Sequence, residues 1–414
     1  MINILTYFKK NHLEILFSGF FFVLILFSKL AAIYIIIIAL VIIVNFSLKK
    51  ISFQLNKFSL LFAAFYITYA IGVIWTQDFD QATRYLENKA VFLLFPFLFS
   101  FQKPTGFNIQ LIYWGLISAT LAAFAYGVYI GIPCYIKHFS FPYCFLKSHL
   151  SPFMHPTYMS AFALISMVST YQLKKVDAIK KSTFIFLIVI FLFYTFLLMS
   201  LAGLLSIMLL AGILFLLYLK NKFSVKIMLA FTILTIIVLS VLISSVPFIR
   251  DDINETVKTT ERYFKSPSIF IQELGESPSS SETRLVMWSI TFEEIAEHPM
   301  GVGTGNVDIY LGRNITQKGN EYFAKKQYNP HNQFLQSQLE IGIIGLLILI
   351  AITFGGIIYS IKKRNLMLIV LFASLTFNCL FESMLQLQAG IIFYLFFFML
   401  LIIDEESNPK KSLS

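Results

Sequence analysis

Long apolar runs constrain the fold of this chain more than any other feature. Its 414 residues contain twelve runs that are long enough, or nearly so, to cross a lipid bilayer. Backbone groups left unpaired in lipid are costly, so a spanning run is expected to be helical. The sequence therefore predicts an all-α polytopic membrane protein with about twelve transmembrane helices, at residues 12–27, 29–46, 58–75, 88–101, 108–130, 156–173, 182–199, 201–219, 226–246, 331–359, 366–381 and 387–403.

The distribution of positive charge orients these helices. The net charge is +10, but 18 of the 32 Lys and Arg residues lie in connectors on one side of the predicted membrane. This side is cytoplasmic by the positive-inside rule, and both termini fall on it. The long polar segment on the other side has 9 basic and 12 acidic residues. The charge therefore serves orientation among membrane lipids, and we exclude nucleic acid as a partner.

The chain divides into membrane-embedded and extramembrane parts. We expect an N-terminal bundle of about nine spans, a large non-cytoplasmic loop, about three C-terminal spans and a cytoplasmic tail, at residues 1–246, 247–330, 331–403 and 404–414. Inside the large loop, helices are predicted at 248–265, 282–297 and, less distinctly, 306–327, with a flexible linker at 275–281. The middle helix has an apolar stripe of Leu285, Trp288, Phe292 and Ile295. Shorter outer loops lie at 76–88 and 131–155.

Cysteine and histidine spacing indicates no metal site. Cys134 and Cys144 share one outer loop, where they either form a disulfide, if the compartment is oxidising, or remain free thiols. The histidines of that loop (His138, His149 and His155) are scattered. The glycine-rich GVGTG at 301–305 follows a helix and lacks the spacing of a dinucleotide fingerprint, so it is a turn. We expect neither a metal nor a cofactor.

His331 is the strongest candidate for chemistry. It lies in NPHNQFLQSQLE (329–340), where Asn329 and Pro330 suit the cap and the first position of a helix. In the first turn, the helix dipole would keep the imidazole neutral and able to accept a proton, and the same helix end suits a phosphate. Asn332, Gln336 and Glu340 follow as a polar stripe running into the bilayer. The alternative is a capping and packing role.

Further candidates are basic or polar residues near the outer surface. Arg284, at the start of the helix 282–297, would either bind a pyrophosphate through its guanidinium or pair with Glu282 or lipid headgroups. Arg84 in the loop 76–88 is a second candidate for phosphate binding, or an ordinary surface residue. His155 precedes Pro156 and either lines an outer cavity or is an interfacial histidine.

The motifs together resemble a known family. The run from Arg284 to Trp288, the glycine-rich turn between His298 and Asn306, and Pro330-His331-Asn332 leading to Glu340-Ile-Gly342 resemble the conserved block of the O-antigen ligase and O-antigen polymerase superfamily. The resemblance spans about 284–345, and the predicted layout, with a large outer loop before a late helix, matches as well.

The resemblance implies a metal-independent glycosyltransferase of the GT-C type in a bacterial inner membrane. Such an enzyme takes a glycan from undecaprenyl diphosphate and passes it to lipid A core, as a ligase, or to a second lipid-linked glycan, as a polymerase. A protein acceptor is a third possibility. By likeness, Arg284 would hold the diphosphate and His331 would activate the acceptor or stabilise the departing charge. Trp288, Asn332 and Gln336 would contact substrate.

One departure from the family pattern concerns the donor. Many members carry a Ser-Arg pair at an outer turn between two mid-chain spans, whereas the turn here reads Met199-Ser200-Leu201-Ala202-Gly203. Either Arg84 or another basic residue replaces that arginine, or the donor is bound differently, or the chain is a divergent or inactive relative. A different class of function, a non-catalytic component of polysaccharide export, would require a continuous polar pore across the spans.

Overall fold

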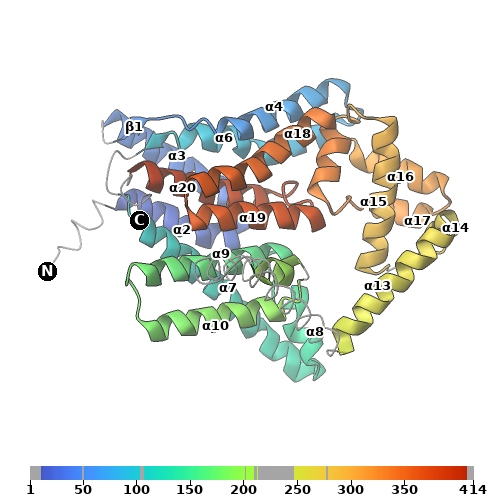
Figure 1. Cartoon of the computed structure of the whole chain (residues 1–414), viewed down its shortest axis with the longest axis horizontal. Helices are drawn as coiled ribbons and strands as arrows, with labels where there is room; N and C mark the ends of the chain where they lie inside the picture. Colours follow the sequence, from blue (N-terminus) through green and yellow to red (C-terminus); the bar gives the residue numbers. More distant parts are fainter. Residues whose placement is uncertain are drawn as a thin grey trace, which may run out of the picture. The chain divides into compact units, whose positions relative to one another are not determined.

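The chain folds almost entirely into helices (Figure 1). The computed structural model describes residues 11–48, 51–102, 107–200, 202–208, 212, 247–276 and 278–407. Its α-helices are α2 (His12–Leu26), α3 (Ala31–Ser47), α4 (Leu60–Gly72), α5 (Phe79–Lys89), α6 (Val91–Leu98), α7 (Ile109–His138), α8 (Phe141–Phe145), α9 (Pro156–Lys175), α10 (Lys181–Leu197), α13 (Pro247–Lys265), α14 (Pro267–Gln272), α15 (Ser280–Glu297), α16 (Val307–Gln317), α17 (Glu321–Lys325), α18 (Gln333–Lys362), α19 (Leu366–Phe381) and α20 (Gln388–Ser407).

Short elements complete the described residues. Three single 3-10 turns are η1 (Ser28–Leu30), η2 (Val73–Trp75) and η3 (Lys147–His149). Two-residue strands β1 (Ser52–Phe53) and β2 (Phe101–Gln102) pair in antiparallel register, with Ser52 opposite Gln102.

The apolar runs do fold as helices. Within the described residues, four helices are long and apolar enough to cross a membrane: Ser28–Ser47, Ile109–His138, Gln333–Lys362 and Gln388–Glu405. Shorter apolar helices lie at four other predicted runs. The chain is therefore an all-α protein with several helices able to span a bilayer. The number twelve stays a prediction, because the runs at 201–219 and 226–246 lie largely outside the described residues, as does most of the tail at 404–414.

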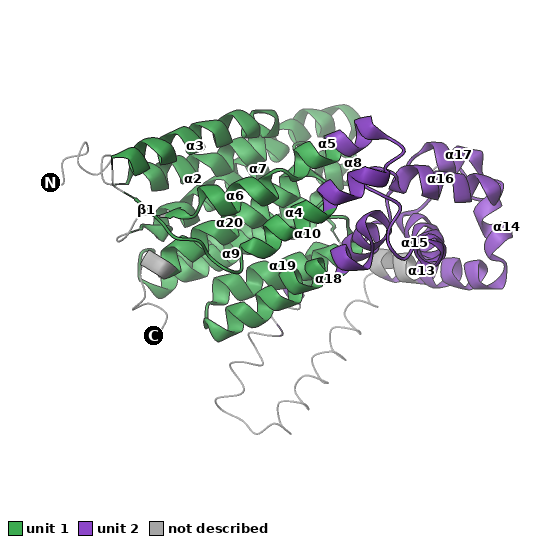
Figure 2. Cartoon of the chain, turned by 90° about the horizontal axis from the view of Figure 1, so that it is seen from above, with its two compact units in different colours: residues 1–68, 84–206, 347–414 green, residues 69–83, 207–346 purple. Residues whose placement is uncertain are grey.

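The chain forms two compact units (Figure 2). Unit 1 comprises residues 1–68, 84–206 and 347–414, and unit 2 comprises 69–83 and 207–346. In unit 1, α7 packs on α2 and α9, and α9 also packs on α10 and α19. Helix α20 is buried along most of its length, and the ring of its Phe396 contacts four aromatic rings of α2 and α6 as well as Phe99.

The cysteines of the second outer loop are joined. A disulfide links Cys134, near the end of α7, to Cys144 in α8, with Cα atoms 5.7 Å apart. The sequence left this pairing open. Cys379 is buried and free. The disulfide fixes the short helix α8 to the end of α7.

Unit 2 has its own hydrophobic core. Residues of α13, α14, α15, α16, α17 and the start of α18 contribute to it, together with Val302 from the loop between α15 and α16. The predicted helices 248–265 and 282–297 are confirmed as α13 and α15. The third predicted helix is broken into α16 and α17 at Gly319, whose φ is +93°. Because Leu339 joins the same core, the first part of α18 is packed together with α15.

Two predicted connecting segments contain helix. Residues 76–88, predicted as a loop, are mostly the amphipathic helix α5, whose length and polar composition do not resemble a membrane span. The linker predicted at 275–281 ends early, because Ser280 is already helical. Ser279 accepts a hydrogen bond from the Glu282 amide, and its own amide donates to the Glu282 carboxylate. This capping box starts α15, and its Ser-x-x-Glu signature is readable in the sequence.

Candidate functional site

Arg284 lies near the start of α15, five residues after the cap Ser279. Glu282, the alternative partner that the sequence suggested for this arginine, takes part in the capping box. Trp288 follows Arg284 by one helical turn, so the two side chains leave the same side of α15. The indole Nε1 of Trp288 is buried, and the described residues provide no hydrogen-bond acceptor for it. Most buried donors in proteins have a partner, so this N–H is open to an acceptor from outside the described residues.

The buried face of α15 differs from the predicted stripe. Val286, Met287 and Ile290 are fully buried, whereas Phe292 is 58% exposed. Leu285 and Ile295 pack only partly against the core. The apolar stripe that contains Phe292 is therefore not the buried face of α15. Apolar residues occur on two sides of this helix, and local spacing does not reveal which side meets the rest of unit 2.

His331 lies before α18 rather than in its first turn. Its backbone adopts the left-handed conformation, with φ at +48°, and its amide donates to Asn329 Oδ1 at 2.8 Å. The helix begins at Gln333, because Asn332 Oδ1 accepts hydrogen bonds from the Phe334 and Leu335 amides at 2.9 and 3.1 Å. The predicted cap at Asn329 is therefore wrong. Asn332 is the cap, and His331 is held by a turn at the positive end of the helix.

The predicted polar stripe is real and points into the protein. Gln336 and Glu340 are 1% and 0% exposed, and the Gln336 Nε2 donates to Glu340 Oε2 at 3.1 Å. Glu340 Oε1 accepts from the Gly305 amide at 3.2 Å. The Gln336 Oε1 is buried without a donor among the described residues. The stripe ends at a break inside α18, since Ile341 and Gly342 are non-helical.

The glycine-rich loop between α15 and α16 is bonded to this break. The Val302 amide donates to the Leu339 carbonyl at 2.7 Å, and the Gly303 amide donates to the Glu340 carbonyl at 3.0 Å. A Cβ on Gly342, whose φ is +71°, would lie 2.4 Å from the backbone of Met300. The two backbones approach this closely only because Gly342 has no side chain. The loop therefore supplies the hydrogen bonds that the end of the helical piece 333–340 lacks.

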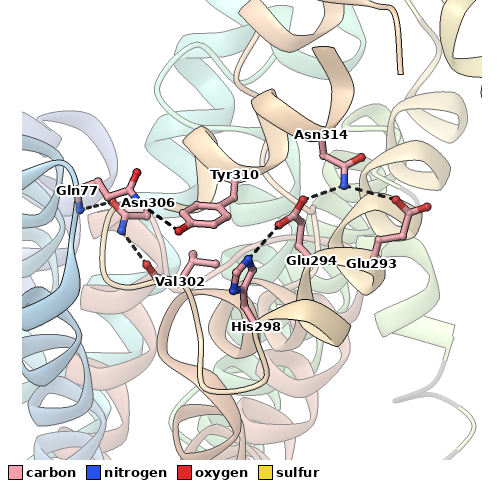
Figure 3. Close-up of polar contacts among 8 residues, drawn as sticks. All are labelled: Gln77, Glu293, Glu294, His298, Val302, Asn306, Tyr310 and Asn314. Carbon is pink, nitrogen blue, oxygen red and sulfur yellow. Dashed lines mark hydrogen bonds and ion pairs between the residues drawn. The ribbon is translucent and has the colours of Figure 1, made fainter. Parts of the chain in front are cut away.

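The same loop holds the segment that precedes α5, as Figure 3 shows for Gln77. Asn306 is fully buried, and its Oδ1 accepts from the Gln77 amide and from Thr76 Oγ1, both at 3.0 Å. Its Nδ2 donates to the Val302 carbonyl at 2.7 Å. The Gln77 side chain donates to the Tyr310 hydroxyl at 3.1 Å. The sequence predicts GVGTG as a turn. It does not reveal that this turn bonds to the segment before α5 and to the break in α18.

Asp308, in the first turn of α16, carries a perturbed carboxyl group. Burial, and to a lesser extent the nearby Glu340 carboxylate, raise the pKa of Asp308 from 3.8 to about 6. Two acidic residues, Asp308 and Glu340, therefore lie close together beside the glycine-rich loop. Asp308 was not among the residues predicted from the sequence, because no local motif marks it.

Three potential metal-ligating groups gather at the end of α15. Ligand atoms of Glu294, Glu297 and His298 lie within 4.8 Å of one another. Glu294 also accepts a hydrogen bond from Asn314 at 2.8 Å, and His298 Nε2 lies 3.9 Å from the Glu294 carboxylate (Figure 3). The expectation of no metal site rested on the histidines of the outer loop 131–155 and overlooked this group. Glutamate and histidine four residues apart on a helix were a readable signal.

The two remaining candidates belong to unit 1. Arg84 is exposed on α5, and His155 is exposed at the start of α9. The His155 side chain caps α9, because its Nδ1 accepts a hydrogen bond from the Thr157 amide at 3.4 Å. At the turn that lacks the family arginine, Ser200 bonds to Thr157 and accepts from the Gly203 amide. Arg284, Trp288, His331, Asn332 and Gln336 are all in unit 2.

Comparison with known families finds a match for one segment of the chain. Residues 186–350 match the family model described as O-antigen ligase. The matched range contains both Arg284 and His331, the glycine-rich loop and the break in α18. A search of the curated proteins found no match. The resemblance is therefore confirmed as a match of residues 186–350 to the O-antigen ligase family model.

Proposed function

We propose that this protein is a membrane glycosyltransferase of the bacterial inner membrane. It takes a glycan from undecaprenyl diphosphate at the non-cytoplasmic face and passes it to lipid A core or to a second lipid-linked glycan. The family match supports the reaction class. The buried indole N–H of Trp288, one turn from Arg284 and without an acceptor among the described residues, carries the assignment of the donor site.

Arg284 and Trp288 bind the diphosphate in this proposal. A guanidinium can donate two parallel hydrogen bonds to phosphate oxygens, and the indole N–H supplies a third donor from the same side of α15. The N-terminal half of the helix adds a favourable potential for an anion. Asn332, beside His331, contacts the substrates in this proposal, whereas Gln336 is buried and bonded to Glu340 and supports the helix instead.

His331 handles the proton of the acceptor hydroxyl. The hydroxyl oxygen attacks the anomeric carbon of the donor glycan and forms the new glycosidic bond. The bond from that carbon to the diphosphate oxygen breaks, and undecaprenyl diphosphate leaves with the electron pair. The hydroxyl proton passes to the His331 imidazole and from there to the leaving diphosphate or to solvent. His331 lies immediately before the cap residue Asn332, at the N-terminal end of α18.

The proposed transfer needs no metal ion. Arg284 and Trp288 supply the charge and the hydrogen bonds that a cation would otherwise give to the diphosphate. Metal independence can be tested at Glu294, Glu297 and His298, because among the described residues these three could hold a divalent ion. Transfer by purified protein should be unchanged by EDTA and by Glu294→Gln. Loss of transfer in EDTA that Zn²⁺ or Mn²⁺ restores would contradict metal independence.

Deletion of the gene tests the function and separates its two forms. A ligase deletion should leave long undecaprenyl-linked polymer that is not attached to lipid A core. A polymerase deletion should leave lipid A core carrying a single repeat. Complementation with the wild-type gene should restore the surface glycan in either case. An unchanged surface glycan and unchanged lipid-linked pools in the deletion strain would reject the proposal.

A replacement of Arg284 tests the donor site. Arg284→Lys keeps the charge but loses the paired donors, and Arg284→Gln loses the charge as well. We expect donor handling to fall roughly ten- to a hundred-fold for loss of a charge-assisted contact, with Lys retaining part of it. The measurement is kcat/KM for the donor in purified protein. Arg313→Gln, an exposed arginine of α16 whose guanidinium lies over the Tyr310 ring, is the matched control.

A further inference from the structure

Glu340 is completely buried at the end of the helical piece 333–340. It lies near Asp308, whose pKa its carboxylate helps to raise. Both of its carboxylate oxygens accept hydrogen bonds, and the two donors come from different segments of the chain.

Each carboxylate oxygen of Glu340 accepts one hydrogen bond. The Gly305 amide donates to Oε1 at 3.2 Å, and the Gln336 Nε2 donates to Oε2 at 3.1 Å. A carboxylate has acceptors only, so it satisfies two donors that arrive from different segments. One donor belongs to the glycine-rich loop, and the other belongs to the helical piece that starts just after His331.

The bond between Glu340 and the glycine-rich loop matters because α18 is broken just after Glu340. Because Ile341 and Gly342 are non-helical, the piece 333–340 is not held in line by a continuous helix. Its orientation depends instead on contacts at its end with residues 299–305. Two of these contacts are backbone bonds to the Leu339 and Glu340 carbonyls, and the third is the Glu340 side chain.

We propose that Glu340 is a positioning residue for the transfer reaction: its carboxylate joins the glycine-rich loop to the helical piece 333–340 and thereby fixes the orientation of His331 at the other end of that piece. The role rests on the proposed function. Glu340 lies about two helical turns from His331, so it acts through the helix and touches neither substrate. A small rotation of a rigid piece of that length displaces its far end, and displacement of a catalytic group by about 1 Å can cost about 10²-fold in rate.

The test compares Glu340→Ala with Glu340→Gln in full-length protein in nanodiscs. The donor is the undecaprenyl-linked glycan of the parent strain with its own acceptor. In Glu340→Gln, the new amide oxygen can still accept from Gly305. Gln336 can turn its amide, because its Oε1 has no donor among the described residues. We expect Glu340→Ala to lower kcat roughly 10- to 100-fold with donor KM within about threefold, and Glu340→Gln to recover most of kcat. Glu293→Ala, a surface carboxylate facing Lys318, is the control.

Hydrogen exchange provides a readout that does not need transfer. Peptides covering residues 299–306 and 333–340 should exchange faster in Glu340→Ala and at the wild-type rate in Glu340→Gln. If wild-type protein transfers no glycan, the proposed function fails, whereas the exchange rates still test the link. Wild-type kcat in Glu340→Ala would overturn the positioning role. So would equal kcat losses in both variants, or a loss confined to donor KM.

Discussion

His331 combines a titratable side chain with a backbone conformation that non-glycine residues seldom adopt. Its φ of +48° is the left-handed region, where histidine, asparagine and aspartate are the most frequent residues after glycine. The conformation costs about 1–2 kcal/mol for an L-residue, and the Asn329 side chain offsets part of it by accepting the His331 amide. The residue at this position has two separable properties, its backbone preference and its imidazole.

Two substitutions separate these properties. His331→Asn keeps a side chain that tolerates the left-handed conformation but removes the base, whereas His331→Ala removes both. We expect transfer to fall about 10²–10⁴-fold in both variants, because the loss of proton transfer dominates. The measurement is kcat in purified protein, with expression and unfolding temperature as the check on folding. Wild-type transfer by His331→Asn would show that the backbone conformation, not the imidazole, is required.

Asp308 should make the stability of unit 2 depend on pH. Its pKa is about 6 in the folded chain, above the usual 3.8, so the folded state binds the proton more tightly. Its carboxyl group therefore does not destabilise the fold below about pH 4. It destabilises the fold increasingly as pH rises toward 6, and fully above that. The difference corresponds to at most about 3 kcal/mol, and partial exposure reduces it to roughly 1–2 kcal/mol.

The substitution Asp308→Asn removes this penalty. We expect the unfolding temperature of the variant to exceed that of the wild type at pH 8 and to equal it at pH 4. Asp308 shares the environment of Glu340, so Glu340→Gln should also lower the Asp308 pKa. A gain in stability that is the same at both pH values would mean that ionisation of Asp308 is not the cause.

At the scale of elements, Gly342 allows the glycine-rich loop to reach the broken helix. A Cβ at this position would meet the Met300 backbone at 2.4 Å, and the φ of +71° already disfavours any other residue. Gly342→Ala should therefore destabilise the chain by several kcal/mol and abolish transfer. Gly355→Ala is the matched control in the same helix, since its Cβ would meet only Phe58 at 3.9 Å. Differential scanning fluorimetry should show a clear drop for the first variant and no drop for the second.

The elements differ in how far the sequence predicts them. Apolar runs coincide with helices such as α7 and α19 because hydropathy is a local property of the chain. The start of α18 was misplaced because both Asn329 and Asn332 are good caps, and only hydrogen-bond geometry distinguishes them. The link between Glu340 and Gly305 joins residues 35 apart, so no local pattern reveals it. Arg284 and His331 were recognisable because they stand in motifs of a known family.

At the scale of the whole molecule, the proposed reaction requires Arg284 and His331 on the non-cytoplasmic side of the membrane. The charge distribution predicts this side for residues 247–330, and cysteine labelling can test it. The native cysteines should react little with a maleimide, because Cys134 and Cys144 form a disulfide and Cys379 is buried. Gly275 is a suitable site for a new thiol, since it is exposed and a Cβ there would meet no atom within 4 Å.

We expect Gly275→Cys to react with a membrane-impermeant maleimide in cells whose inner membrane is intact. Lys362→Cys, at the exposed end of α18, is predicted on the cytoplasmic side and should react only after the inner membrane is permeabilised. Both variants replace exposed residues. The opposite labelling pattern would place Arg284 and His331 with the cytoplasm and so remove them from a reaction at the outer leaflet. Labelling of both sites in intact cells would mean instead that the predicted number of spans between them is wrong.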